Sequence, residues 1–123
     1  QSRRVLPFAL DGKAVLPAKT PYVAKAAPDP GFRADAAAAG AGEGIFNIRC
    51  AVCHGGGAIA GGTAPDLRTS LAVMSPDIFT GIVRDGTLVP AGMPRFEELT
   101  DKDLAAVRQY LRTRADALRR ERP

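Results

Sequence analysis

The sequence predicts an all-α domain of three to four helices connected by long loops. Apolar residues recur at helical spacing in the segments 34–50, 76–85 and 100–111, and the last two of these segments begin at favourable N-terminal caps. No alternation of strand and helix patterns follows residue 17, and glycine and proline are concentrated between the periodic segments. These observations favour a small helical core with irregular chain before and between the helices.

Residues 1–16 and 17–33 are expected to lie outside this core. Two short apolar runs flank Asp11-Gly12, a dipeptide that favours a hairpin turn because both residues tolerate positive φ. Such a hairpin is only marginally stable by itself in water. Four prolines follow within residues 17–30, where they fix φ, remove backbone donors and exclude helix. We expect an extended or hairpin segment, followed by a proline-rich strap that lies on a surface.

The helical core is expected to begin near Ala34. An alanine-rich first helix runs to Cys50, and Ser75-Pro76-Asp77 provides the cap and first turn of a second helix that ends at Asp85-Gly86. The last helix opens with the capping box Thr100-Asp101-Lys102-Asp103. The apolar face of this helix is formed by Leu104, Val107, Tyr110 and Leu111.

Length and composition limit the class of protein. The 123 residues are sufficient for one domain, and an aromatic content of 6% without tryptophan leaves its core short of bulky side chains. The formal net charge is +4, with arginines clustered near both ends, where we expect solvated arms. No nucleic-acid-binding motif and no apolar run of transmembrane length are present, so neither nucleic acid nor a membrane span is expected. A start at Gln1 fits either a removed signal peptide or a piece of a longer chain.

Both cysteines and the only histidine lie within five consecutive positions, Cys50-Ala-Val-Cys53-His54. A structural zinc site needs about four protein ligands, and a redox-active disulfide lies beside a parallel sheet and needs no histidine. A cysteine nucleophile takes its histidine from elsewhere in the chain. Covalent haem attachment uses the arrangement Cys-x-x-Cys-His itself. The motif therefore favours a c-type haem, bound through Cys50 and Cys53 with His54 as iron ligand, and a haem ring would also fill the core.

With no second histidine, the sixth iron position is left to Met74, Met93 or an open site. Met93 is preferred because it lies in the restricted loop Gly92-Met93-Pro94, 39 residues after His54, whereas Met74 is assigned to the core. The other ring nitrogen of His54 is expected to donate to a carbonyl of the Ala64-Pro65 loop, which Pro65 stiffens. Three arginines that could face haem propionates are treated as solvated and are not assigned: Arg68, Arg84 and Arg95.

Residues 34–114 resemble a class I cytochrome c. Gly42 and Phe46 match the glycine and the aromatic residue of that family's first helix, and Tyr110 matches the aromatic residue of the last helix that they meet. The other matches are the attachment motif Cys50 to His54, the histidine-supporting loop at Pro65 and Leu67, and the ligand loop Gly92-Met93-Pro94. The resemblance implies the cytochrome c fold and haem c, with Pro65 and Met93 among the residues that bind it.

The flanking sequence is similar to the junction in quinohaemoprotein alcohol dehydrogenases. In that family a β-propeller carrying pyrroloquinoline quinone is followed by a linker and a C-terminal cytochrome c domain. The stretch from Phe8 to Pro17, the proline-rich strap and Pro65-Asp66-Leu67-Arg68 carry this similarity. It implies a propeller remnant over residues 1–16, a linker over 17–33 and a cytochrome c domain with a basic C-terminal tail over 34–123. It also implies that the quinone, calcium and the catalytic residues lie in a missing dehydrogenase domain.

Two functions are compatible with these features. The chain is either the electron-relay domain of a periplasmic alcohol-oxidising quinohaemoprotein or a free-standing soluble periplasmic monohaem cytochrome. In the first case residues 1–33 pack on a propeller, and in the second they fold onto the haem domain or are disordered. The expected acceptor is a small cytochrome, a copper protein or a quinone pathway, and the net charge favours an acidic one. Peroxidase catalysis needs an open iron position, which Gly92-Met93-Pro94 disfavours.

Overall fold

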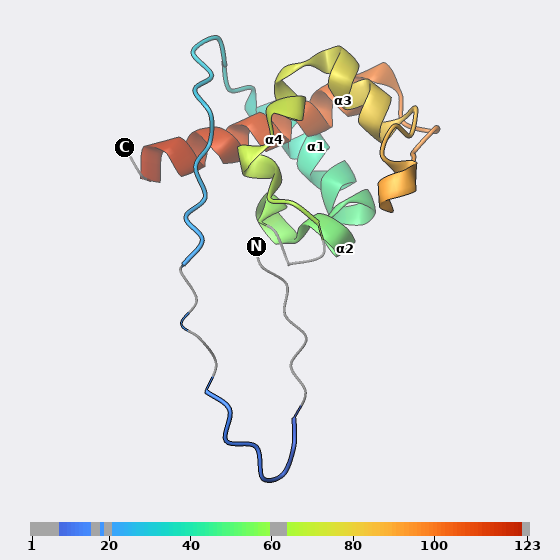
Figure 1. Cartoon of the computed structure of the whole chain (residues 1–123). Coiled ribbons are helices and arrows are strands. Elements are labelled where there is room, and N and C mark those ends of the chain that lie inside the picture. The colour runs from blue at the N-terminus through green and yellow to red at the C-terminus, as the bar shows by residue number, and fades with distance from the viewer. Residues whose placement is uncertain (1–7, 16–17, 19–20, 60–63, 122–123) are drawn as a thin grey trace.

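The structure is a computed structural model that describes residues 8–15, 18, 21–59 and 64–121. Over these ranges its regular elements are α-helices and short 3-10 helices, which confirms the predicted all-α class. The α-helices are α1 (Ala36–Arg49), α2 (Ala51–His54), α3 (Pro76–Val83) and α4 (Asp101–Glu121). The 3-10 helices are η1 (Gly56–Ala58), η2 (Leu67–Thr69), η3 (Leu71–Met74) and η4 (Val89–Ala91). α1 and α4 cross, and the shorter elements are grouped around this pair (Figure 1).

The starts of α3 and α4 are set by the capping residues that the sequence indicates. Ser75 Oγ accepts a hydrogen bond from the Ile78 N–H at 3.3 Å, and Pro76 occupies the first turn of α3. At α4, Asp103 Oδ2 accepts from the Thr100 N–H at 2.9 Å, while Thr100 Oγ1 accepts from the Asp103 N–H at 3.2 Å. Both predicted helix starts are therefore confirmed.

The centre of the fold is the crossing of α1 and α4. A Cβ atom built on Gly42 would overlap the carbonyl group of Ala106 and would lie 2.8 Å from the main-chain nitrogen of Val107. Phe46, one turn further along α1, is fully buried and packs against Tyr110 with 5.3 Å between the ring centroids. The missing side chain at position 42 thus permits the close approach of the two helices, as the resemblance to cytochrome c implied.

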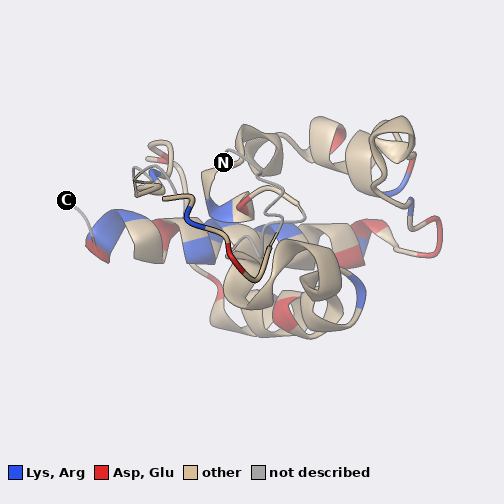
Figure 2. Cartoon of the chain, turned by 60° about the horizontal axis from the view of Figure 1, so that its bottom comes forward, with Lys and Arg blue, Asp and Glu red and all other residues tan. Residues whose placement is uncertain are grey.

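α4 is longer than its predicted apolar face, and this corrects the expectation of a solvated basic tail. Ala115 and Leu118 are buried in its C-terminal half, which continues to Glu121. Acidic residues occupy its first turn and basic residues its last turn, an arrangement that favours the helix dipole (Figure 2). No helix in the described part of the chain combines the length and apolar character of a membrane span.

Three arginines of α4 donate to carbonyl groups of other segments: Arg108 to Val73 and Met74, Arg114 to Gly57, and Arg119 to Ala27.

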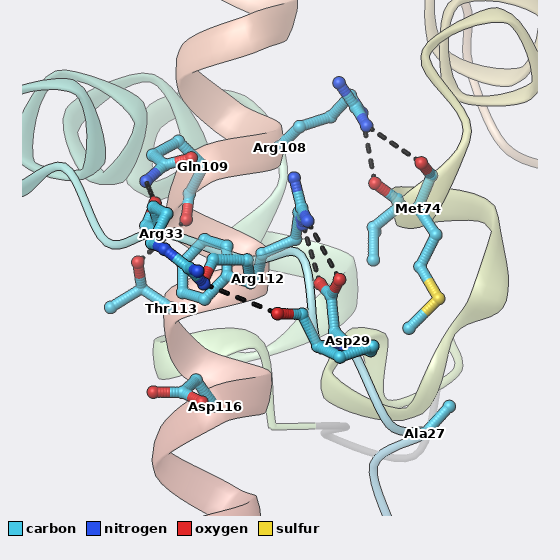
Figure 3. A network of polar contacts seen from close by, with 12 residues as sticks. Ala27, Asp29, Arg33, Met74, Arg108, Gln109, Arg112, Thr113 and Asp116 are labelled. Atoms are coloured by element: carbon cyan, nitrogen blue, oxygen red, sulfur yellow. Dashed lines mark hydrogen bonds and ion pairs between the residues drawn. The ribbon is translucent and has the colours of Figure 1, made fainter.

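The strap lies on α4 over residues 27–33 (Figure 3). Arg112 makes two hydrogen bonds to the carboxylate of Asp29, at 2.8 and 2.9 Å, and its guanidinium carbon lies 4.9 Å from the ring centroid of Phe32. Gln109 Nε2 donates to the main-chain oxygen of Arg33 at 2.8 Å. The hydrogen bond from Arg112 lowers the pKa of Asp29 below its usual range. The surface that the strap was expected to cover is therefore α4.

Residues 8–15 extend away from the helices around a single turn (Figure 1). The Gly12 N–H donates to the Ala9 carbonyl at 3.1 Å, so the central residues of the turn are Leu10 and Asp11 rather than the predicted Asp11 and Gly12. No strand pairing forms within residues 8–15, as expected for an apolar segment with no sheet to pack against. The remainder of the predicted hairpin, residues 5–7 and 16, lies outside the described residues.

Candidate haem site

The cysteine and histidine residues of the motif lie where α1 ends and α2 begins. Cys50 caps α1 by donating its N–H to the Phe46 carbonyl at 2.8 Å, and Cys53 and His54 belong to α2. The His54 N–H donates to the Cys50 carbonyl at 3.0 Å, so one helical turn relates Cys50 to His54. Both cysteines are half-buried and have free thiols. One short segment therefore supplies both thiols and the imidazole.

His54 is held in a defined tautomer. Its side chain is buried, with 6% of the residue exposed, and its Nδ1 lies 3.1 Å from the carbonyl oxygen of Pro65. Because a carbonyl oxygen can only accept, Nδ1 carries the proton and donates it, and in the neutral imidazole this leaves the lone pair on Nε2. This tautomer is the one that binds a metal ion through Nε2. The predicted hydrogen bond from His54 to the Ala64-Pro65 loop is thus present.

The loop after Pro65 is fixed by a buried ion pair that the sequence analysis missed. Asp66 is 6% exposed, and its carboxylate accepts from Nε of Arg68 at 3.0 Å and from Nη2 at 2.7 Å. This hydrogen bonding raises the pKa of the Arg68 guanidinium. The expectation that Arg68 is solvated is therefore wrong, and opposite charges two residues apart after a proline were the available signal. The other two unassigned arginines also form ion pairs, at more exposed positions: Arg84 with Asp101 and Arg95 with Glu97.

The two methionines are both half-buried and both pack against the hydrophobic core. Met93 lies in a constrained loop, because its N–H donates to the Leu88 carbonyl at 3.2 Å and the preceding Gly92 adopts a φ of 90°. Met74 ends η3, and its carbonyl accepts from Arg108 at 3.1 Å. The hydrogen-bonded loop is consistent with a fixed position for Met93, whose role as an iron ligand stays a prediction.

The alternative chemistries for the cysteines lose support. In the described part of the chain, no three side chains of His, Cys, Asp or Glu come together in the way that a structural zinc site requires. Both thiols are free, and the described ranges contain no parallel sheet of the kind that accompanies a redox-active disulfide. Burial raises the pKa of the Cys50 thiol to about 11, which keeps it protonated and poorly nucleophilic at neutral pH.

The residues present fit a covalently bound haem. Cys50 and Cys53 provide two thiols at the spacing needed for thioether bonds, and the lone pair on Nε2 of His54 is available for iron. The thioether of Met93 is a soft ligand of the kind that c-type haem iron accepts. Together with the glycine and aromatic contacts at the crossing of α1 and α4, the two thiols and the histidine indicate a c-type cytochrome domain.

The chain belongs to the cytochrome c family described as "Cytochrome C oxidase, cbb3-type, subunit III", which matches residues 37–111. It is 40% identical over 114 residues to "Quinohemoprotein alcohol dehydrogenase ADH IIB" of Pseudomonas putida, a match that covers 90% of this chain. It is 36% identical to "Alcohol dehydrogenase (quinone), dehydrogenase subunit" of Gluconobacter oxydans over 92% of this chain. The solved structure of the quinohemoprotein alcohol dehydrogenase ADHIIG from Pseudomonas putida HK5 superposes with a TM-score of 0.71 and 35% identity, over 92% of this chain.

The chain spans only 15–16% of the length of these three proteins. It is therefore a cytochrome c domain that is homologous to one segment of quinohemoprotein alcohol dehydrogenases.

Proposed function

We propose that this chain is the electron-relay domain of a quinohaemoprotein alcohol dehydrogenase. In this role it receives electrons singly from reduced pyrroloquinoline quinone and passes them to an external acceptor. The observation that carries the proposal is the extent of the similarity. The cytochrome family match begins at residue 37, but the match to ADH IIB covers 90% of the chain and must include most of residues 1–36. An independent cytochrome has no evident reason to share this segment with a dehydrogenase.

The residues of this chain hold the haem and set the ligation of its iron. Bound haem c supplies reversible one-electron transfer. Cys50 and Cys53 would anchor the haem through thioethers, and His54 would bind its iron through Nε2. Met93 would be the second protein ligand of the iron, where a soft sulfur would favour the ferrous state. The carbonyl of Pro65 keeps the proton on Nδ1 of His54 and fixes the plane of the ring.

The dehydrogenase chemistry is assigned to a domain outside these 123 residues. We infer that pyrroloquinoline quinone and calcium are bound there and that no residue of this chain acts as a proton-transfer catalyst. A periplasmic location follows from covalent haem attachment, which takes place outside the reducing cytoplasm. The acceptor is a small cytochrome, a copper protein or a quinone pathway, and the net charge of +4 favours an acidic partner through steering that salt weakens.

A free-standing periplasmic monohaem carrier is the second candidate. It is favoured by the strap, because residues 27–33 fold onto α4 through the ion pair between Asp29 and Arg112. Residues 8–15 favour the first candidate. Three apolar residues of this segment are fully or almost fully exposed, with relative accessibilities of 92% for Phe8, 108% for Leu10 and 92% for Val15. Several exposed apolar side chains on one extended segment are typical of a surface that contacts a partner. Both candidates share the same haem site and differ in what contacts the N-terminal segment.

A visible spectrum of the purified protein, oxidised and then reduced, tests the haem site. We expect the sharp reduced bands of c-type haem and, in the oxidised protein, the weak far-red band of a methionine bound to iron. A colourless protein would contradict the proposal and return Cys50 and Cys53 to zinc or disulfide chemistry.

The donor is tested by stopped-flow reduction of the oxidised chain. The reductant is a dehydrogenase domain of the ADH IIB type, freed of its own cytochrome and loaded with pyrroloquinoline quinone, calcium and an alcohol. We expect reduction that requires the alcohol, and the same mixture without the quinone is the control. Absence of reduction in a protein with a normal haem spectrum would favour the free-standing carrier.

A further inference from the structure

Apart from Tyr110, whose hydroxyl is buried, His54 and Asp66 are the buried polar side chains in the described part of the chain, and both lie next to Pro65. His54 contacts the Pro65 carbonyl, and Asp66 is the next residue in sequence. Burial of a carboxylate is unfavourable unless its oxygens are fully hydrogen-bonded to a cation. Asp66 directly follows the carbonyl that accepts the hydrogen bond from His54 Nδ1, and this position points to a role at the histidine.

Asp66 is held at both its side chain and its main chain. Its Oδ1 accepts from the Arg68 N–H at 3.1 Å and from Nε at 3.0 Å, and its Oδ2 accepts from Nη2 at 2.7 Å. Its carbonyl oxygen accepts from the Thr69 hydroxyl at 2.9 Å and from the Thr69 N–H at 3.3 Å. Only 5% of the Asp66 side chain and 13% of the Arg68 side chain are exposed. Water therefore does not readily replace these bonds.

These contacts fix the peptide plane that contains the Pro65 carbonyl. The proline ring fixes φ of Pro65, one bond before the ψ rotation that orients this plane, and the hydrogen bonds of Asp66 restrict the φ rotation that borders the plane on its other side. The carbonyl oxygen is thereby kept 3.1 Å from Nδ1 of His54. The ion pair of Asp66 and Arg68, with the bonds from Thr69, is called the clamp below. η2, which contains Arg68 and Thr69, also packs against α4, so the clamp is attached to the longest helix.

We propose that Asp66 and Arg68 are positioning residues that hold the Pro65 carbonyl on Nδ1 of His54 and thereby set the strength of the imidazole as an iron ligand. This inference rests on the proposed haem function. Donation of the Nδ1 proton to a fixed carbonyl increases the basicity of the ring and favours ferric iron. When the clamp is loosened, this hydrogen bond weakens, ferrous iron is favoured and the reduction potential rises.

The chain contains a matched control for this clamp. Asp29 also pairs with an arginine through two hydrogen bonds, and only 12% of its side chain is exposed, but it belongs to the strap and not to the histidine loop (Figure 3). Asp66→Asn and Asp29→Asn each remove one negative charge and one doubly hydrogen-bonded ion pair. The two carboxylates are not matched in distance from the haem site, so removal of charge alone also changes the potential unequally, and the exchange rate of the Nδ1 proton is the readout that separates positioning from charge.

The experiment compares the haem-loaded wild type, D66N and D29N by redox titration and by NMR of protein labelled with ¹⁵N-histidine. His54 is the only histidine, so its ring signals need no further assignment. We expect a higher reduction potential in D66N than in D29N. We also expect exchange of the Nδ1 proton with solvent to be faster than wild type in D66N and to stay near the wild-type rate in D29N.

A second variant covers the case in which D66N does not fold. Arg68→Lys keeps the charge but loses the fork of two hydrogen bonds, and we expect faster Nδ1 proton exchange and a potential above the wild type. Equal changes in D66N and D29N, or wild-type exchange in R68K, would overturn the positioning role while leaving the haem function intact. A colourless wild-type protein would overturn the haem function and, with it, this inference.

Discussion

Replacement of Gly42 by alanine tests the close approach of α1 and α4. The added Cβ would meet main-chain atoms of Ala106 and Val107, which cannot move aside as the end of a flexible side chain can. We expect α1 and α4 to separate and the haem-loaded protein to lose stability. The same substitution at Gly40 or Gly44, in the same helix, meets no atom within 4 Å and provides the matched control.

The size of the effect follows from three opposing contributions. Alanine is favoured over glycine inside a helix by about 1 kcal/mol, and this gain applies at all three positions. Overpacking at position 42 costs about 3 kcal/mol, the upper part of the usual range, because both partners are backbone. Loosening of the Phe46 and Tyr110 ring contact removes up to about 1 kcal/mol more. The net loss for G42A is about 3 kcal/mol, or roughly 12 °C in Tm for a domain of this size.

The assay is unfolding of the haem-loaded protein by guanidinium chloride or heat, followed by circular dichroism. G40A and G44A should be more stable than the wild type by up to about 1 kcal/mol, so the sign of the effect reverses within one helix. An unfolding midpoint of G42A at or above that of the wild type would refute the role of Gly42 in the helix crossing.

Three further outcomes are expected. Met93→Ala should abolish the weak far-red band of the oxidised protein. Met74→Ala should keep this band and lower the unfolding free energy by about 1–2 kcal/mol, because Met74 is a half-buried core residue. Loss of the band in M74A would instead identify Met74 as the iron ligand. Arg112 lowers the pKa of Asp29 in the folded state, so their ion pair stabilises the protein above the unfolded aspartate pKa of about 3.9 and this stabilisation is lost as the pH falls toward the lower folded value. Unfolding measured from pH 5 to pH 2 should therefore show a steeper loss in the wild type than in D29N, and parallel curves would contradict the assignment. Ser75→Ala should lower the unfolding free energy by about 1 kcal/mol without altering the visible spectrum, and an unchanged stability would exclude Ser75 as the cap of α3.

Much of the fold could be predicted because the informative interactions are local. Ser75 and Thr100 bond to groups three residues away, so the starts of α3 and α4 can be recognised in a single sequence window. The haem motif is also local, since Cys50 and His54 lie within one helical turn. The hydrogen bond from His54 to Pro65 spans eleven residues and was predicted only because a proline stiffens the receiving loop.

Interactions between distant segments could not be predicted in the same way. The arginines of α4 were expected to be solvated because a charged side chain is exposed by default. Arg112 instead pairs with Asp29, 83 residues earlier, and no pattern near either residue indicates the other. Asp66 and Arg68 were missed for a different reason. The sequence shows that they lie two residues apart, but it does not show that their ion pair is buried. That burial depends on the packing of η2 against α4.

The contacts of α4 also have a consequence for the kinetics of folding. Its side chains bond to η3 across 35 residues, to η1 across 57 residues, and to Asp29 and Ala27 of the strap across 83 and 92 residues. Contacts of such sequence separation are unusual for a helical domain and slow its folding, because long loops must close before any contact forms. Until α4 docks, the strap before the haem motif and the 3-10 turns η1 and η3 after it lack these anchoring contacts. We therefore expect docking of α4 to be the late, rate-limiting event that converts separate local elements into a single cooperative unit.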